Sequence, residues 1–328
     1  MELIDTHGRV ATDLRVSLTD RCNLRCQYCM PAEGLEWMPT EEVLSDAELV
    51  RLIGIGVRRL GIRDVRFTGG EPLLRRGLAS IIAATKELPG APQTAITSNG
   101  MGLRHTAEAL ARAGLDRVNI SLDTTDPETF HRITRRDRLQ DVIDGLQAAK
   151  DAGLAPVKVN AVLLRGMNVD QAPDLLRWCM KHDYELRFIE QMPLDAQHGW
   201  SREAMVTAAE TLELLSDHFV LEPLPGRGSA PAERFLIDGG PQTVGIIASV
   251  TRPFCGDCNR VRLTADGQVR NCLFAREESD LRTALRDGAD DTEIARRWAA
   301  AMLTKLPGHG IDDPSFLQPT RPMSSIGG

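Results

Sequence analysis

Three cysteines, Cys22, Cys26 and Cys29, stand in a C-x3-C-x2-C pattern within one short segment. A tetrahedral zinc site takes four protein ligands, and a disulfide framework needs an even number of cysteines and an oxidising compartment. Three thiolates suit a cubane iron–sulfur cluster, in which the fourth iron stays open to a small molecule. The segment therefore indicates a reaction centre. From spacing alone, the alternative is a zinc knuckle completed by a distant His or Cys.

A second group of three cysteines, Cys255, Cys258 and Cys272, follows a C-x2-C-x13-C pattern far downstream. Alone, this spacing is more typical of zinc, with His309 or an Asp as the fourth ligand. Two three-thiol sites in one chain instead favour two clusters that each keep an open iron. The remaining cysteine, Cys179, lies in a helical pattern and is predicted to be a small core residue.

The composition is that of an ordinary globular protein. The 328 residues are 42% hydrophobic and 26% charged, with a net charge of −7. This balance argues against a nucleic-acid binder or a membrane-surface binder. The N-terminal residues contain no apolar signal segment, and no run is long enough to span a bilayer. Seven cysteines, six of them in two clusters, and the lack of an export signal predict reduced thiolates in the cytoplasm.

The elements that must position these cysteines alternate between short β patterns and helical patterns. The alternation implies parallel strands, and both an open sheet and a barrel fit it. The rhythm stops near Trp200, which divides the chain into residues 1–200 and 201–328. In the second part, residues 221–231 are predicted to form a surface loop, and Asp266-Gly267 turns a hairpin that leads to Cys272. The six expected strands cover residues 14–18, 65–68, 94–97, 118–122, 157–164 and 186–189.

Polar residues occupy every second position of nearly all these strands, so they share one face of the sheet. On that face Arg15, Arg66 and Lys158 would converge and favour an anion pocket. For each cation alone, the alternative is a structural ion pair or an exposed strand edge. Arg260 and Arg262 also point to one common side if they lie in a strand, and the alternative for them is a solvated face. The other polar residues of the shared face include Ser17, Thr68, Thr97, Asn119, Ser121, Asp123 and Asn160.

Together these motifs resemble a known family. The C-x3-C-x2-C pattern with Tyr28 before the last cysteine, and Gly69-Gly70-Glu71 after the second strand, resemble the radical S-adenosylmethionine (SAM) superfamily. The C-terminal stretch from Cys258 to Gly267 and the Gly-Gly tail resemble the GTP 3′,8-cyclases of molybdenum cofactor biosynthesis (the MoaA family). The resemblance runs from Asp13 to Gly328. Departures are small: Ser98 and Gln191 stand where Thr and an aromatic residue are frequent.

The resemblance implies an α/β fold: an incomplete (βα)6 TIM-type barrel in residues 1–200, and a smaller α+β region in 201–328 that carries the second cluster. It implies two [4Fe-4S] clusters, the first binding SAM and the second binding GTP. The implied ligands are Cys22, Cys26 and Cys29 for the first cluster and Cys255, Cys258 and Cys272 for the second. The implied SAM contacts are Tyr28, Gly70, Ser121 and Met192. The implied GTP contacts are Arg15, Arg66, Thr97, Lys158, Arg260, Val261 and Arg262, and the catalytic residues are Arg260, Arg262, Gly327 and Gly328.

The implied reaction uses a 5′-deoxyadenosyl radical from SAM, which takes the ribose 3′ hydrogen of GTP. The resulting carbon radical attacks guanine C8, and a further reduction gives the cyclised nucleotide. A one-electron reductant and a downstream cyclic pyranopterin monophosphate synthase are the implied partners, with a homodimer as one assembly state. Two alternatives are a peptide-modifying radical SAM enzyme and a non-catalytic zinc or electron-carrier protein.

Overall fold

The predicted strands belong to one continuous, strongly curved sheet in the computed structural model, which describes residues 1–327. Its centre is the six-stranded parallel run expected from the βα alternation, in the order of the chain. The strands are β1 (Asp13–Ser17), β2 (Asp64–Thr68), β3 (Gln93–Ser98), β4 (Arg117–Ser121), β5 (Val157–Val162) and β6 (Glu185–Ile189). Polar side chains at the carboxyl ends of such strands meet at one edge of the sheet.

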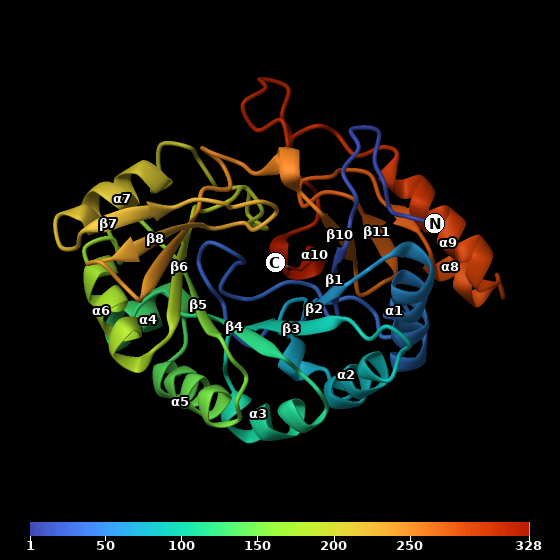
Figure 1. The fold of residues 1–328 in the computed structure, drawn as a ribbon, viewed down its shortest axis with the longest axis horizontal. Helices are drawn as coiled ribbons and strands as arrows, with labels where there is room; N and C mark the ends of the chain where they lie inside the picture. The colour runs from blue at the N-terminus through green and yellow to red at the C-terminus, as the bar shows by residue number, and fades with distance from the viewer. Residues whose placement is uncertain (328) are drawn as a thin grey trace.

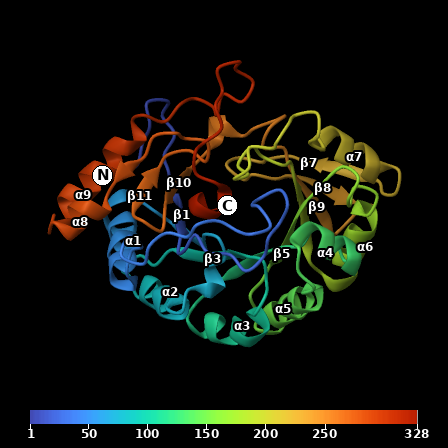
Figure 2. The same ribbon diagram turned by 180° about the vertical axis from the view of Figure 1, so that it is seen from behind.

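Helices connect these strands and cover the outer side of the sheet (Figures 1 and 2). One of them, α4, was not expected from the sequence, although Asp126 caps its N-terminus and Pro127 begins it. The 3-10 turn η1 (Pro72–Leu74) follows β2. The helices are α1 (Asp46–Leu60), α2 (Leu78–Lys86), α3 (Leu103–Arg112), α4 (Pro127–Thr134), α5 (Leu139–Asp151) and α6 (Ala172–His182).

The C-terminal third of the chain extends the sheet at both edges. Beside β6 lie β9 (Thr243–Ile247), β8 (Glu233–Ile237) and β7 (Leu221–Leu224). Beside β1 lie β10 (Arg260–Leu263), β11 (Gln268–Arg270) and β12 (Ser279–Asp280). Strands β9 and β10 run parallel to their neighbours β6 and β1. In residues 1–327 no hydrogen bonds join the end strands β7 and β12, so the barrel is incomplete, as predicted.

The expected loop over residues 221–231 is partly wrong. Leu221–Leu224 forms β7, which pairs with β8 at the edge of the sheet. Pro223 fits there because an edge strand tolerates a missing N–H donor. The hairpin at Asp266-Gly267 is confirmed, with Arg262 opposite Arg270. The division at residue 200 stays a prediction, although both edges of the sheet belong to the later part.

The remaining elements follow the added strands. They are α7 (Ala208–Ser216), the 3-10 turn η2 (Cys255–Asp257), α8 (Arg282–Arg286), α9 (Asp291–Met302) and the short α10 (Met323–Ile326). Helix α10 lies near the centre of the curved sheet, on the side away from the outer helices (Figure 1). In the described part of the chain no helix is long and apolar enough to cross a membrane.

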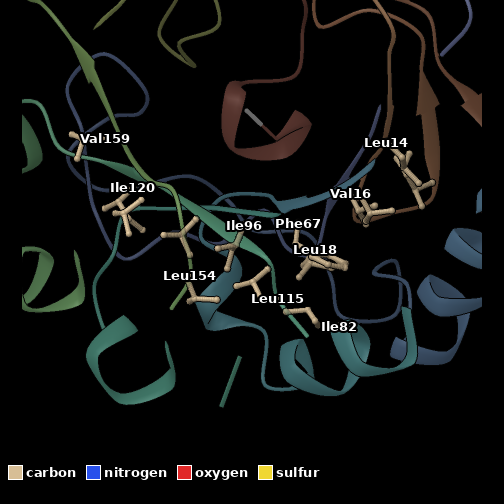
Figure 3. Close-up of a cluster of buried hydrophobic side chains, with 14 of the residues drawn as sticks. Leu14, Val16, Leu18, Phe67, Ile82, Ile96, Leu115, Ile120, Leu154 and Val159 are labelled. Atoms are coloured by element: carbon tan, nitrogen blue, oxygen red, sulfur yellow. The ribbon is translucent and has the colours of Figure 1, made fainter. Parts of the chain in front are cut away.

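The core fills the space between the sheet and its outer helices. The apolar positions of the strands, such as Leu14, Phe67 and Ile96, are fully buried and face α2 and its neighbours (Figure 3). Truncating such a side chain to Ala costs about 2–5 kcal/mol. Packing of this apolar face against the helices stabilises the sheet. The opposite, polar face is not needed for the core and can line a cavity.

Candidate active site

A cavity of about 470 Å³ opens on the concave face of the sheet. Its lining comes from the strand ends, from both cysteine segments and from the loop before β10. Most of the site residues expected from the sequence meet here. They are Arg15, Tyr28, Cys29, Arg66, Thr97, Ser121, Met192, Cys255, Cys258, Arg260, Arg262 and Cys272.

The first cysteine segment packs tightly against the turn after β2. Gly70 N donates to Thr19 O at 2.8 Å, and Glu71 N donates to Arg21 O at 2.7 Å. A Cβ at Gly70 would lie 2.3 Å from Arg21 O, and one at Gly69 would lie 2.2 Å from Thr19 O. The two glycines therefore allow the turn to hold the cysteine segment at van der Waals distance.

Glu71 stabilises the same turn through hydrogen bonds to its carboxylate. It is fully buried, and its carboxylate accepts from Leu73 N, Ser98 Oγ and Asn99 N at 2.7–2.9 Å. Burial raises its pKa to about 7, although these three donors oppose the rise. Ser98, a departure from the family pattern, keeps the hydroxyl that this carboxylate needs.

The thiols of the first segment are free and embedded in the protein. Burial raises the pKa of Cys22 and of Cys26, and burial with the charges of Cys22 and Asp195 raises the pKa of Cys29 to about 12. Such thiols become thiolates when a metal supplies the missing positive charge. Three thiols on one short loop, with no cation in hydrogen-bond contact with a sulfur in the described residues, fit the three protein ligands of a [4Fe-4S] cluster.

Tyr28, which belongs to this segment, is held in place by a buried carboxylate. Its hydroxyl donates to Asp123 Oδ2 at 3.0 Å, and Val162 N donates to Asp123 Oδ1 at 2.8 Å. Burial raises the pKa of Asp123 to about 6. Asp123 thus joins the cysteine segment to the carboxyl ends of β4 and β5, where Ser121 and Asn160 also line the cavity.

The second group of cysteines lies on another wall of the cavity. Cys255 begins η2, Cys258 directly follows it, and Cys272 follows β11. Arg9 holds this wall, because its guanidinium donates to the carbonyls of Cys255, Leu306 and Pro307 at 2.7–2.9 Å. Burial raises the pKa of Cys258, but Lys305 and the neighbouring arginines outweigh it and lower that pKa below its ordinary value. These three thiols fit a second cluster.

His309 does not complete a zinc site with these cysteines. Its Nδ1 accepts from Ile311 N at 3.1 Å, and its Nε2 lies 3.1 Å from Ser249 O, to which it donates. Both ring nitrogens are therefore engaged by the backbone. Ligands of one zinc ion lie within about 4 Å of one another, as bond lengths of ~2.3 Å require. In residues 1–327 no three His, Cys, Asp or Glu side chains are grouped to hold a single metal ion.

A row of arginines crosses the floor of the cavity. Arg262, Arg15 and Arg66 are direct partners on the adjacent strands β10, β1 and β2. Like charges in such positions repel. Burial, with repulsion from Arg15 and Arg260, lowers the pKa of Arg262 to about 9, and burial followed by repulsion from Arg15 also lowers that of Arg66. The Nε and Nη1 atoms of Arg66 are buried without a partner, as are the Nε atoms of Arg15 and Arg262.

Asp13 is the carboxylate nearest to this row. It lies 3.9 Å from Arg15 and 3.6 Å from Arg260. Burial would raise its pKa, but the surrounding guanidinium groups lower it below the ordinary value. One carboxylate cannot balance several arginines, and their buried N–H groups still need acceptors. The cavity floor therefore fits a multiply charged anion.

Arg187 is a site residue that the sequence analysis missed. It lies in β6 opposite Gly245, keeps 8% exposure, and its Nε has no partner. A Cβ at Gly245 would lie 2.7 Å from Arg187 Cγ, so the glycine makes room for this side chain. The signal was present in the sequence, because the alternation rule applied to β6 places Arg187 on the polar face. Other lining residues outside the expected set include Asn259, Asn271 and Phe254, whose ring lies 4.4 Å from the Arg260 guanidinium.

Several expected residues lie outside the cavity lining. Lys158 shares the polar face of β5, but its Nζ pairs with Glu185 at 3.0 Å near the start of the strand. Val261 is fully buried on the core side of β10. Gly70 contacts the cysteine segment instead. The contact roles given to these residues by resemblance stay predictions.

The C-terminal tail lies inside the barrel, near the centre of the curved sheet (Figure 1). Ser17 Oγ donates to Ile326 O at 2.8 Å, and Met323 N donates to Leu194 O at 2.9 Å. Gly327 has φ +82°, and a Cβ there would lie 2.4 Å from Ser17 Oγ and 2.6 Å from Thr68 Cγ2. A glycine is therefore required at this position. The other half of the predicted pair, Gly328, lies outside the described residues.

The open barrel, the cysteine loop after β1 and the Gly-Gly-Glu turn after β2 define a radical SAM protein. The Radical SAM superfamily model matches residues 16–179, and the Molybdenum Cofactor Synthesis C model matches residues 184–311. The crystal structure of Streptococcus suis SuiB shares the fold, with a TM-score of 0.61 at 14% identity over 93% of this chain and 68% of that one.

Curated relatives identify the family within that class. GTP 3′,8-cyclase of Streptomyces coelicolor is 66% identical over 328 residues, covering 99% of this chain and 96% of the relative. GTP 3′,8-cyclase of Mycolicibacterium smegmatis is 59% identical, covering 99% and 92%. The chain belongs to the GTP 3′,8-cyclase family.

Proposed function

We propose that this protein converts GTP into its 3′,8-cyclised form, using SAM and two [4Fe-4S] clusters, as the first step of molybdenum cofactor biosynthesis. One observation carries the proposal: Cys29 of the first group of free cysteines and all three cysteines of the second group line a single cavity, whose floor is a row of arginines with buried, unpartnered N–H groups. The high identity to curated GTP 3′,8-cyclases over the whole chain supports the same activity.

The arginine row provides the site for the triphosphate of GTP. Arg15, Arg66 and Arg262 offer fork-shaped donors to phosphate oxygens, and Arg187 adds a fourth guanidinium across the cavity. Anion binding also relieves the repulsion within the row. Thr97 adds a hydroxyl on the same floor. Lys158 contributes at longer range, because its ammonium is already paired with Glu185.

The first cysteine group and its neighbours provide the SAM site. When bound, SAM on the reduced first cluster supplies a carbon-centred radical that can take a hydrogen atom from the substrate. Tyr28 is oriented toward this ligand by Asp123, and Ser121 and Met192 line the same wall. Gly70 contributes by letting the turn approach the cysteine segment closely.

The second cysteine group provides the site for the guanine base. We therefore expect the ribose to lie between the two cysteine groups. Arg260 and Arg262 lie beside this group, where they hold negative charge near the base and the phosphates. Val261 acts indirectly, by anchoring the strand that carries both arginines in the core. Gly327 closes the centre of the barrel and excludes water. The catalytic role given to Gly328 by resemblance stays a prediction.

The wider role follows from the same chemistry. A one-electron reductant supplies the first cluster, and a downstream cyclic pyranopterin monophosphate synthase uses the product. Free thiols throughout the described chain suit a reducing cytoplasm. A homodimer is one assembly state to be tested.

The test mixes anaerobically reconstituted protein with GTP, SAM and a strong reductant. We expect 5′-deoxyadenosine to form in amounts that depend on GTP, together with a nucleotide product that retains the triphosphate. ATP at the same concentration serves as the control for base recognition. Formation of 5′-deoxyadenosine at the same rate with and without GTP would contradict the proposal.

A further inference from the structure

Lys305 is a buried ammonium that contacts a cysteine of the second group. The residue follows α9 and keeps 4% exposure. Its Nζ lies 3.7 Å from Cys258 Sγ, 3.3 Å from Cys258 O and 3.1 Å from Arg260 O. Its three donors therefore point at two carbonyl oxygens and one ligand sulfur.

No carboxylate of residues 1–327 lies within 4.0 Å of this ammonium. Other lysines with a buried part do have one: Lys86 pairs with Asp116 and Lys158 pairs with Glu185, both at 3.0 Å. Arg9, the other cation at this wall, is balanced by Asp5 at 2.6 Å. A buried cation without a counter-charge is costly. Asp5 attracts Lys305 from beyond 4.0 Å, and the negative charge in contact with the ammonium is that of the Cys258 thiolate.

The first cysteine group has different surroundings. The polar side chain in contact with Cys22 Sγ is the neutral amide of Asn99, whose Nδ2 lies 3.9 Å away. The charged groups that act on Cys22, Cys26 and Cys29 include the carboxylates Glu71, Asp123 and Asp195. One cation, Arg25, also acts on Cys22, but its Nη1 donates to Cys22 O at 2.7 Å rather than to a sulfur. The two groups therefore differ in what contacts a cysteine sulfur: a neutral amide at the first and an ammonium at the second.

Reduction potentials of iron–sulfur clusters depend on net charge and on hydrogen bonds to the sulfurs. One-electron reduction makes a thiolate-bound cluster more negative by one unit. A fixed ammonium against one of its sulfurs stabilises that reduced form, and a neighbouring carboxylate opposes it.

We propose that Lys305 is the counter-cation and sulfur hydrogen-bond donor of the second cluster, and that it raises the reduction potential of this cluster above that of the first. An electron from a one-electron reductant is then more stable on the second cluster, at the substrate side of the cavity, than on the first. This inference relies on the second cysteine group holding a cluster, as in the proposed function. Lys305 acts here as a positioning and tuning residue, because it contacts the thiolate rather than the substrate.

The test compares wild-type protein with Lys305→Met, which keeps the side-chain length without the charge, and with Lys305→Arg, which keeps the charge. Lys150→Met, on the exposed side of α5, is the matched control. All proteins are reconstituted anaerobically, their iron and sulfide are counted, and both clusters are titrated with a mediated reductant while electron paramagnetic resonance is recorded. The signal that changes on addition of SAM is assigned to the first cluster.

We expect Lys305→Met to make reduction of the second cluster about tenfold less favourable, a shift of ~59 mV to lower potential for one electron. The first cluster should not shift, and Lys305→Arg and Lys150→Met should match wild type. Selective loss of the second cluster in Lys305→Met, with retention in Lys305→Arg, also supports the charge role.

An unchanged second potential in Lys305→Met would overturn the inference. So would equal shifts of both clusters, or loss of the second cluster in both Lys305 variants, which would indicate a packing role. A wild-type protein that binds four irons rather than eight would contradict the proposed second cluster itself, and this result is distinguishable from the others by the iron count.

Discussion

Replacing Arg66 with Ala removes one end of the arginine row. The substitution should change two separate quantities: the affinity for GTP and the stability of the protein without ligand. Arg66 has two buried nitrogen atoms without partners, Nε and Nη1, so its hydrogen bonds form when an anion binds. A hydrogen bond to a charged group contributes about 1.5–3 kcal/mol. We therefore expect GTP to bind about 10- to 150-fold more weakly to Arg66→Ala.

The same substitution relieves repulsion in the protein without ligand. Adjacent strands are about 5 Å apart, and two unit charges at that distance repel by roughly 3 kcal/mol at an effective dielectric constant near 20. Removing Arg66 takes away its repulsion with Arg15, its direct partner on β1. The unfolding temperature of Arg66→Ala without GTP should thus equal or exceed that of wild type, although a side chain has been truncated.

The assay is anaerobic isothermal titration calorimetry with GTP, supported by an iron count and by thermal unfolding with and without inorganic triphosphate. Arg104→Ala, which removes an exposed arginine paired with Asp144 on the outer helices, is the control. Both clusters should stay loaded in each variant. GTP affinity within twofold of wild type, or a loss of iron with normal GTP affinity, would refute the phosphate role of Arg66.

Three further predictions concern other parts of the chain. Arg9→Ala removes the guanidinium that binds three carbonyls at the second cysteine wall, so iron content should fall from about eight toward about four per chain; full retention of iron would contradict this. Gly327→Ala places a methyl group 2.4 Å from Ser17 Oγ, and we expect carboxypeptidase to remove the tail faster and GTP-dependent turnover to fall at least ~10-fold with both clusters present; wild-type rates of both would refute it. Glu48→Gln weakens the capping box of α1 and the ion pair with Arg286, which together lower the pKa of Glu48 to about 2. Since a depressed carboxylate pKa stabilises the fold above the unfolded value of about 4.3, urea unfolding should show a loss of ~1 kcal/mol at pH 6 that shrinks as the pH falls toward 2; a loss that is constant with pH would contradict it.

Much of the sheet was predictable from local patterns, and so were the cavity residues of β1, β2 and β4. The alternation of polar and apolar residues in β1, β2 and β4 depends on strand geometry alone, so it placed Arg15, Arg66 and Ser121 on one face. The Asp266-Gly267 turn is also a local signal, and it was confirmed. The capping box of α1 at Ser45 is a further signal of this local kind.

The remaining parts depend on contacts between distant segments. The register that aligns Arg262 with Arg15 joins residues far apart in the chain, and no local pattern encodes it. The pairing of Lys158 with Glu185, which takes its ammonium away from the cavity lining, likewise depends on how β5 and β6 align. The clamp of Arg9 on Cys255 and the buried contact of Lys305 with Cys258 are further examples. Arg187 was accessible to the alternation rule, which had not been applied to β6.

The central claim is that the two cysteine groups and the arginine row act on one GTP molecule in one cavity. The most direct measurement incubates the reconstituted protein with reductant, SAM and GTP that carries deuterium at the ribose 3′ carbon. The 5′-deoxyadenosine is then analysed by mass spectrometry. We expect one deuterium in 5′-deoxyadenosine with the 3′-labelled substrate and none with GTP labelled at guanine C8. Unlabelled 5′-deoxyadenosine from the 3′-labelled substrate would contradict it.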